Sequence, residues 1–188
     1  MSAKRVLGID PGTGICGFGV IQYEARKQPR MITAGVITTP AHTPLEDRLL
    51  DIYDSLNQII DETHPDEVSI EKLYFNQNIT TGITVAEARG VCILVAKQHN
   101  IPIAEYTPLQ IKQTLTGYGR AKKKDMQEAV RVYLKMEQIV KPDDAADALA
   151  AAITHALMTR IAYRWASSQR AYAWQNSKSM LIYKHGLN

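Results

Sequence analysis

Three stretches near the start of the chain alternate between apolar and polar residues with a period of two. They cover Arg5–Asp10, Ile15–Tyr23 and Met31–Ile37, and the segments between them contain Gly and Pro. A period of two is typical of a strand with one buried face, and Gly and Pro favour turns between such strands. The pattern predicts three strands in an antiparallel meander.

A helical period follows the third strand. Thr43-Pro44-Leu45-Glu46 has the form of a capping box with proline at the first helical position. Apolar residues then recur at intervals of three or four, which predicts a helix with one buried stripe. The stripe consists of Leu45, Leu49, Ile52, Leu56, Ile59 and Ile60.

Strand and helix patterns then alternate to the end of the chain, which predicts an α/β fold with a mixed five-stranded sheet flanked by helices. The predicted strands are Glu67–Glu71 and Ile101–Tyr106. The predicted helices are Thr81–His99, a short helix that begins at Thr107-Pro108 and ends at Gly117 and Gly119, Lys122–Met136, and an alanine-rich helix from Asp143 to about Tyr163.

The composition is that of one globular domain of 188 residues with 45% hydrophobic and 22% charged residues. No apolar run approaches the roughly 20 residues of a membrane helix, and the N-terminus lacks the layout of a signal peptide. Cys16 and Cys92 form no CxxC pattern, so we expect reduced thiols. These features favour a cytoplasmic protein without a membrane segment.

The net charge of +3 is concentrated at the C-terminal end, because five Lys and Arg residues and no acidic residue follow Asp147. Binding of nucleic acid by the main domain therefore has to depend on local clusters of charge. We expect most of the basic segment to be frayed helix, although its interleaved Tyr and Trp also suit contact with nucleic acid or a partner.

Four acidic residues are candidates for one site. Asp10 and Glu71 each end a strand whose earlier residues are apolar, and ligand sites gather at the carboxyl ends of strands in α/β sheets. Asp144 and Asp147 are three positions apart and so share a helix face, where small alanines allow close approach to the sheet. Asp143 or Asp144 could instead be the N-cap of that helix, and the residues alone leave this open.

A carboxylate cluster without Cys or His is a hard oxygen site, which suits Mg²⁺ or Mn²⁺ rather than zinc. His155 lies 11 residues after Asp144, about 16 Å along a helix, and so is too distant to share a metal with it. We expect His155 to be structural or to face a partner.

A dense positive cluster occurs before the last predicted helices: Lys112, Arg120, Lys122, Lys123 and Lys124. Cations at a helix N-terminus oppose the macrodipole, and a polyanion would offset that cost. A solvated lysine run is the alternative. Tyr74 and Phe75 fall in a predicted loop after Glu71, where an aromatic ring can stack on a base or fold back onto the core.

These motifs together resemble the RuvC family of Holliday junction resolvases, in order and spacing, over about residues 5–158. The resemblance is carried by GIDPGTGICGFGVI, SIEKLYFNQN, EARGV, IKQTLTGYGRAKKKDMQ and DDAADALAAAITH. It implies an RNase H-like nuclease domain over residues 1–158, followed by a basic, aromatic-containing tail over 159–188. The family carboxylates map onto Asp10, Glu71, Asp144 and Asp147, which favours Asp144 over Asp143.

The resemblance also implies the activity. Family members are homodimers that cut four-way DNA junctions with paired symmetric nicks, leaving 5′-phosphate and 3′-hydroxyl ends, with two Mg²⁺ ions per site or Mn²⁺ in their place. DNA contacts of the family map onto Tyr74, where phenylalanine is usual, and onto Lys112 and Lys123, with Lys122 and Lys124 as neighbours within a one-residue shift. Partnership with the RuvA and RuvB branch-migration proteins follows from the same likeness, and Thr81–His99 is our candidate for part of the dimer interface.

Two other functions have to be weighed. The IDPGT stretch also resembles the phosphate loop of sugar kinases and actin-like ATPases, but those proteins need two such domains and this chain has no second D-x-G-T stretch. A junction-binding protein without catalysis is disfavoured by the retention of all four acids.

Overall fold

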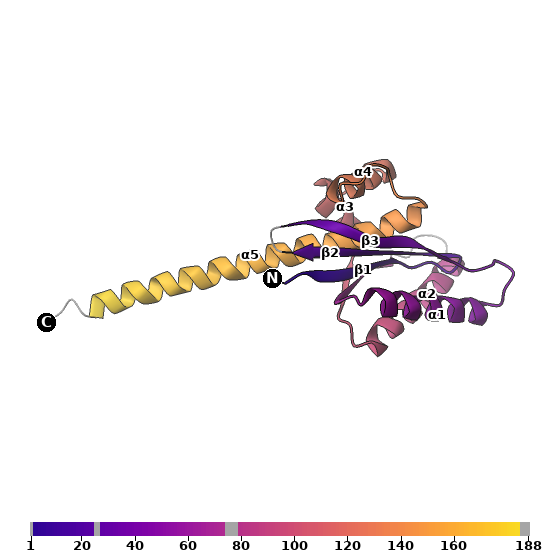
Figure 1. The fold of residues 1–188 in the computed structure, drawn as a ribbon, viewed down its shortest axis with the longest axis horizontal. Coiled ribbons are helices and arrows are strands. Elements are labelled where there is room, and N and C mark those ends of the chain that lie inside the picture. Colours follow the sequence, from indigo (N-terminus) through magenta and orange to yellow (C-terminus); the bar gives the residue numbers. More distant parts are fainter. Residues whose placement is uncertain (1, 25–26, 74–78, 185–188) are drawn as a thin grey trace. The chain divides into compact units, whose positions relative to one another are not determined.

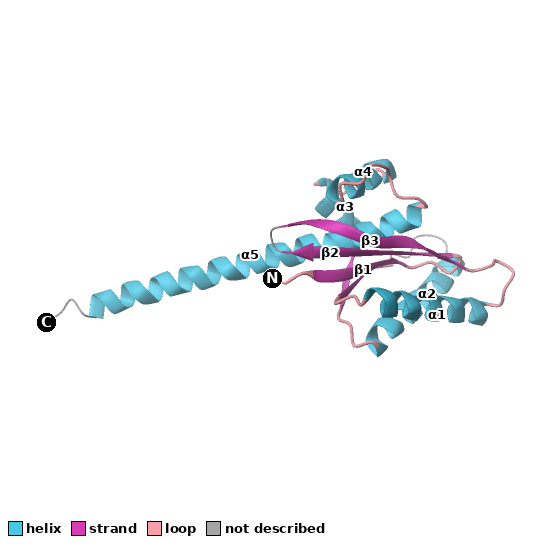
Figure 2. Ribbon diagram, viewed as in Figure 1, coloured by secondary structure: helices cyan, strands magenta, loops and turns pink. Residues whose placement is uncertain are grey.

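The computed structural model describes residues 2–24, 27–73 and 79–184. Five strands form one sheet in the order β3-β2-β1-β4-β5 (Figures 1 and 2). Strand β1 pairs antiparallel with β2 and parallel with β4, which in turn pairs parallel with β5. The strands are β1 Lys4–Asp10, β2 Ile15–Glu24, β3 Lys27–Thr38, β4 Glu67–Glu71 and β5 Ile103–Tyr106.

One face of the sheet packs on two helices, α1 (Leu45–Thr63) and α2 (Ile79–Gln98) (Figure 1). The period of two directs Leu7 and Ile9 of β1 into this layer. The core also contains Val20, Ile37, Ile52, Leu56, Ile60, Val68, Ile70, Ala88, Cys92 and Val95.

The first part of α5 (Asp143–Lys184) packs on the opposite face. Contact is close because β1 and β2 present glycines there: a Cβ on Gly8 would lie 2.0 Å from the carbonyl oxygen of Ala148. In β4, the Ser69 hydroxyl donates to the carbonyl oxygen of Ala151 at 2.8 Å. The alanines of α5 therefore bring its first turns directly onto the sheet, as predicted.

Two shorter helices, α3 (Pro108–Thr116) and α4 (Lys123–Tyr133), lie on the same side as the start of α5 (Figure 1). Thr107 caps α3 through a capping box with Gln110, and Gly117 ends the helix in the left-handed conformation at φ 75°. Both features follow from the Thr-Pro start and the Gly stop in the sequence.

The predicted α/β architecture is confirmed, with two local corrections. The capping box at Thr43 is wrong: Pro44 is the N-cap of α1, and no side chain caps it. The last helix continues to Lys184 rather than ending near Tyr163. Residues 164–184 contain neither Gly nor Pro to end it.

The chain divides into two compact units, Met1–Ala156 and Leu157–Asn188. In the described part of the chain, no helix is both long enough and apolar enough to cross a bilayer.

Candidate active site

The last residues of two parallel strands bring Asp10 and Glu71 together. Strands β1 and β4 are neighbours in the register Ile9↔Ile70, so their terminal residues are adjacent. Since Ile9 and Ile70 face α1 and α2, the period of two directs Asp10 and Glu71 toward α5. Their apolar strands thus end in two carboxylates on one side of the sheet.

The first two turns of α5 add Asp144 and Asp147 to this side. The approach is set by Gly17 of β2, where a Cβ would lie 2.1 Å from the carbonyl oxygen of Asp144. Glu71, Asp147 and Asp144 all act electrostatically on Asp10, so the four candidate acids share one region.

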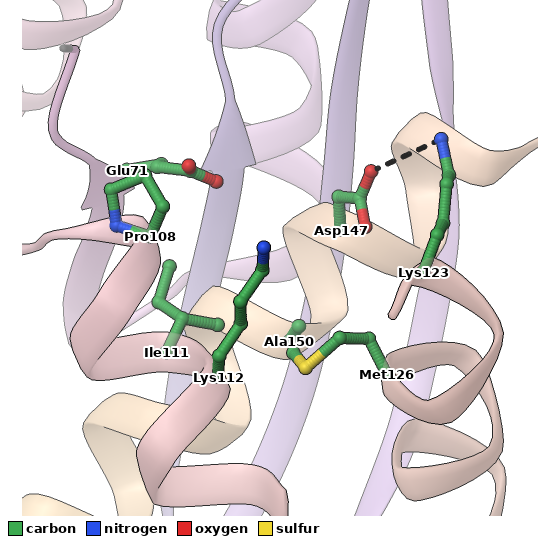
Figure 3. A pocket seen from close by; sticks show the side chains of 8 residues that line it. All are labelled: Glu71, Pro108, Ile111, Lys112, Lys123, Met126, Asp147 and Ala150. Atoms are coloured by element: carbon green, nitrogen blue, oxygen red, sulfur yellow. Dashed lines mark ion pairs between the residues drawn. The ribbon is translucent and has the colours of Figure 1, made fainter. Parts of the chain in front are cut away.

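A pocket of about 250 Å³ opens beside these acids. Figure 3 shows the Glu71 carboxylate and the Lys112 amine directed into the same space, with Asp147 across from them. The Lys123 ammonium lies 3.7 Å from Asp147 Oδ2 and 3.2 Å from Asp143 Oδ2. Pro108, Ile111, Met126 and Ala150 form the apolar part of the wall.

The pKa values of Asp10, Glu71 and Asp147 are raised, because these carboxyl groups are buried and lie near one another. Burial and the charges of Glu71, Asp147 and Asp144 raise the pKa of Asp10 to about 8, although Lys123 opposes the shift. Burial and Asp147 raise the pKa of Glu71 to about 7, opposed by Lys112. Burial also raises the pKa of Asp147. The site therefore holds more negative charge than its own lysines neutralise.

The donor set fits hard divalent cations, because its side-chain ligands are carboxylate oxygens and their repulsion is relieved by positive charge. Within the described residues, no three carboxylate, thiol or imidazole groups lie close enough together to hold a metal ion. Lys123 supplies positive charge beside Asp147 instead.

Asp143 is held by side chains of α4 and of the segment before α5. Its carboxylate accepts hydrogen bonds at 2.8 Å from Gln127 and at 2.8 Å from Lys141, and it pairs with Lys123. Hydrogen bonds from Lys141 and Lys123 lower the pKa of Asp143 to about 2. Asp143 thus ties α4 to the start of α5. The sequence did not predict this contact, because Gln127 is an unremarkable polar residue in a helix.

The basic cluster divides in the structure. Lys112 and Lys123 line the pocket, whereas Lys122 and Lys124, at the start of α4, do not. Tyr74, the candidate for base stacking, lies outside the described residues. The apolar wall of Ile111 and Met126 was not singled out from the sequence, although both follow the buried stripes of their helices.

His155 is structural, as one of the two sequence-based alternatives predicted. Its Nε2 lies 3.0 Å from Glu67 Oε2, and its Nδ1 lies 2.9 Å from the Tyr106 hydroxyl. Glu67 also accepts hydrogen bonds from Lys4 and from the Tyr23 hydroxyl. This network joins α5 to strands β1, β2, β4 and β5, and its carboxylate, Glu67, begins β4 at the end away from Glu71.

The fold, with acids at the ends of its strands, defines the class as metal-dependent nucleases with an RNase H-like sheet. The family model described as crossover junction endodeoxyribonuclease RuvC matches residues 6–155, and the chain belongs to the RuvC family.

Curated relatives agree with this assignment. The chain is 46% identical to RuvC of Thermomicrobium roseum over 158 residues, which are 84% of this chain and 96% of the relative. It is 49% identical to RuvC of Brevibacillus brevis over 152 residues, which are 81% and 91% of the two chains.

A solved structure extends the likeness to three dimensions. The structure of T. thermophilus RuvC in complex with Holliday junction substrate superposes with a TM-score of 0.81 at 30% identity, over 85% of this chain and 96% of that one.

Proposed function

We propose that this chain is a Mg²⁺-dependent endonuclease that resolves four-way DNA junctions in homologous recombination and DNA repair. The observation that carries the proposal is the convergence of Asp10, Glu71 and the start of α5 beside a lysine-lined pocket, in a member of the RuvC family. The proposed products are paired, symmetric nicks with 5′-phosphate and 3′-hydroxyl ends.

In this proposal Asp10, Glu71, Asp144 and Asp147 hold two Mg²⁺ ions, or Mn²⁺ in their place. The bound ions would activate a water molecule, neutralise charge developing on the phosphate and stabilise the departing 3′-oxygen. Support comes from the oxygen-only donor set and from the raised pKa values of Asp10 and Glu71. Each acid would release its proton when it becomes a ligand.

The lysines act on the DNA. Lys112 and Lys123 border the pocket from two helices and would hold the scissile phosphate in place. Contact with the DNA would exchange the Asp143 and Asp147 partners of Lys123 for phosphate oxygens. Lys122 and Lys124 would contact the backbone further out, and Tyr74 would stack on bases at the crossover.

A homodimer would place two such sites on opposed strands. The proposed interface includes the exposed side of α2, where Ile83 and Leu94 are exposed and a Cβ on Gly90 would meet nothing within 4 Å. Ala88, by contrast, is buried in the core of its own chain. We further propose the cytoplasm as location, RuvA and RuvB as partners, and residues 1–158 as the nuclease domain.

The test is a nicking assay on a synthetic four-way junction with immobile arms, with and without Mg²⁺. The expected result is a pair of opposed nicks that DNA ligase can seal, formed only with the metal. Junction binding without nicking at any Mg²⁺ or Mn²⁺ concentration would overturn the catalytic part. Binding of ATP in place of junction DNA would overturn the proposal as a whole.

A further inference from the structure

The segment of α5 from residue 157 onward carries positive charge only. It belongs to the second compact unit, Leu157–Asn188, and its helix continues to Lys184. It contains no Asp or Glu. Its basic residues are Arg160, Arg164, Arg170, Lys178 and Lys184.

Helical geometry gathers these five residues on one side. At 3.6 residues per turn, their positions fall within one half of the helix circumference, and Tyr163 and Trp174 fall in the same half. The opposite half includes Met158, Ile161 and Trp165, whose exposed fractions are 38%, 62% and 66%. We call the half of the helix that holds the five basic positions its basic face.

This segment lies outside what the chain shares with its relatives. The family model ends at residue 155. The match to the Thermomicrobium roseum protein covers 96% of that relative but 84% of this chain. The basic helix is thus an addition to the shared nuclease unit, and its charge is not explained by the common site.

We infer that residues 157–184 bind a duplex arm of the junction through its phosphates, an inference that rests on the proposed function. From Arg160 to Lys184 the helix rises about 36 Å at 1.5 Å per residue, which is close to one turn of duplex DNA. A basic face of this length complements the charge of a duplex, and the bound phosphates release counterions.

Two other occupants fit the segment less well. Pairing with the same helix of a second copy would bring ten cations together without an acidic partner, which is unfavourable. A membrane surface would need an apolar half, but that half also contains Ser168, Gln169, Asn176 and Ser179. Duplex DNA requires only the basic face.

The first test measures the salt dependence of binding. The full chain is compared with a variant in which all five basic residues are replaced by Gln, on a duplex of roughly 20 base pairs, about two turns. The slope of log K against log salt is expected to become shallower by about 2 to 4, since each phosphate contact contributes about 0.9. The matched control exchanges Arg for Lys and Lys for Arg at the same five positions and is expected to keep the wild-type slope.

The second test uses the tryptophans as a built-in probe. Trp165 and Trp174 are the two tryptophans of the chain, and both lie in this segment. Adding the same duplex is expected to change tryptophan emission in the wild type and in the charge-preserving control, and to leave it unchanged in the Gln variant.

Three results would overturn the inference. The first is a salt slope that is unchanged in the Gln variant, and the second is tryptophan emission that does not change when DNA is added. The third is emission that changes instead with protein concentration or with anionic lipid vesicles. Nicking by the wild type is measured in parallel. If nicking occurs while emission ignores DNA, only this inference fails. If emission follows DNA while no junction is nicked, the proposed catalysis fails, and what stands of the inference is duplex binding by residues 157–184.

Discussion

Strand β4 begins and ends with a glutamate, and the two have opposite electrostatic surroundings. Glu67 and Glu71 lie on the same side of the strand, and both are half-buried. Burial raises the pKa of each. At Glu67, hydrogen bonds from Lys4 and Tyr23 and the charge of His155 outweigh burial, so its pKa lies below the ordinary value. At Glu71, Asp147 adds to burial and the pKa rises to about 7.

The difference shows that the partners of a carboxyl group, more than its depth, decide whether folding lowers or raises its pKa. The Glu67 end is complete, because its carboxylate has donors from β1, β2 and α5. The Glu71 end has acids from β1 and α5 as neighbours, and Lys112 and Lys123 offset their repulsion only in part. One end of the α5–sheet contact is therefore electrostatically complete, and the other is the end at which we propose that a cation binds.

The largest expected effect comes from Asp10→Asn at the functional end. Loss of one ligand charge is expected to reduce junction cleavage by about a thousand-fold or more, while junction binding survives because the lysines remain. Cleavage and binding are measured on the same junction. A parallel loss of both would mean that Asp10 is structural and that the two ends of the strand do not differ in kind.

At the Glu67 end of β4 we expect the opposite result, a loss of stability without a loss of cleavage. Glu67→Gln is expected to lower the free energy of unfolding by about 2 kcal/mol, since it leaves Lys4 and His155 beside a neutral group. Urea unfolding measures the loss, and cleavage per folded molecule is expected to stay near the wild-type rate. Asp51→Asn, at an exposed position of α1, is the control and is expected to change stability by less than about 0.5 kcal/mol. Cleavage that falls with Glu67→Gln at full folding would contradict the separation of the two ends.

A smaller effect is expected at Lys123, which borders the pocket beside Asp147. Lys123→Ala is expected to weaken junction binding about ten-fold and to make its salt slope shallower by about 0.9, the share of one phosphate contact. Lys122→Ala and Lys124→Ala are the comparison variants: both residues lie outside the pocket, and their proposed DNA contacts are further from the scissile phosphate, so a smaller loss of binding is expected. If Lys122→Ala reproduces the full effect and Lys123→Ala has none, the phosphate contact belongs one residue earlier in the chain.

Much of the fold was predictable because its signals are local. Strand periods, the Thr107 cap and the Gly117 stop each act within a few residues, and the structure confirms them. The predicted cap at Thr43 is wrong because Thr and Pro are common both at a helix cap and in the turn before a helix, so the residue types alone do not locate the cap. The end of α5 was placed too early, since no residue before Lys184 forces a helix to stop.

The candidate site was predictable from strand ends and helix spacing, but its balance of charge was not. Sequence showed that Asp10 and Glu71 end buried strands. It did not show that Asp143 is held by Gln127 and Lys141, because that contact depends on how α4 docks against α5. The contrast between Glu67 and Glu71 was likewise hidden, since His155 and Tyr106 are 88 and 39 residues from Glu67.

The smallest expected effect is a pH dependence of stability at Glu71. In the metal-free fold the pKa of Glu71 is raised from 4.5 to about 7, so the native state holds this proton more tightly than the unfolded state. The stability that protonation provides is complete below about pH 4.5 and is lost as the pH rises through about 7. Glu71→Gln does not titrate. With a chelator present, it is expected to match the wild type at pH 4.5 and to be more stable by about 1 kcal/mol at pH 8, after allowance for partial solvent screening.

Thermal unfolding at the two pH values measures this difference, and Glu67→Gln is its counterpart. The pKa of Glu67 is lowered by folding, so its contribution to stability is present at neutral pH and is lost as the pH falls below 4.5. The deficit of Glu67→Gln is therefore expected to shrink toward acid pH, while the advantage of Glu71→Gln grows toward alkaline pH. Adding Mg²⁺ at pH 8 is expected to reverse the order at Glu71, because the wild type then gains a ligand that the variant binds less well. An offset for Glu71→Gln that is the same at pH 4.5 and pH 8 would show that burial and repulsion from Asp147 do not raise the pKa of this carboxyl group.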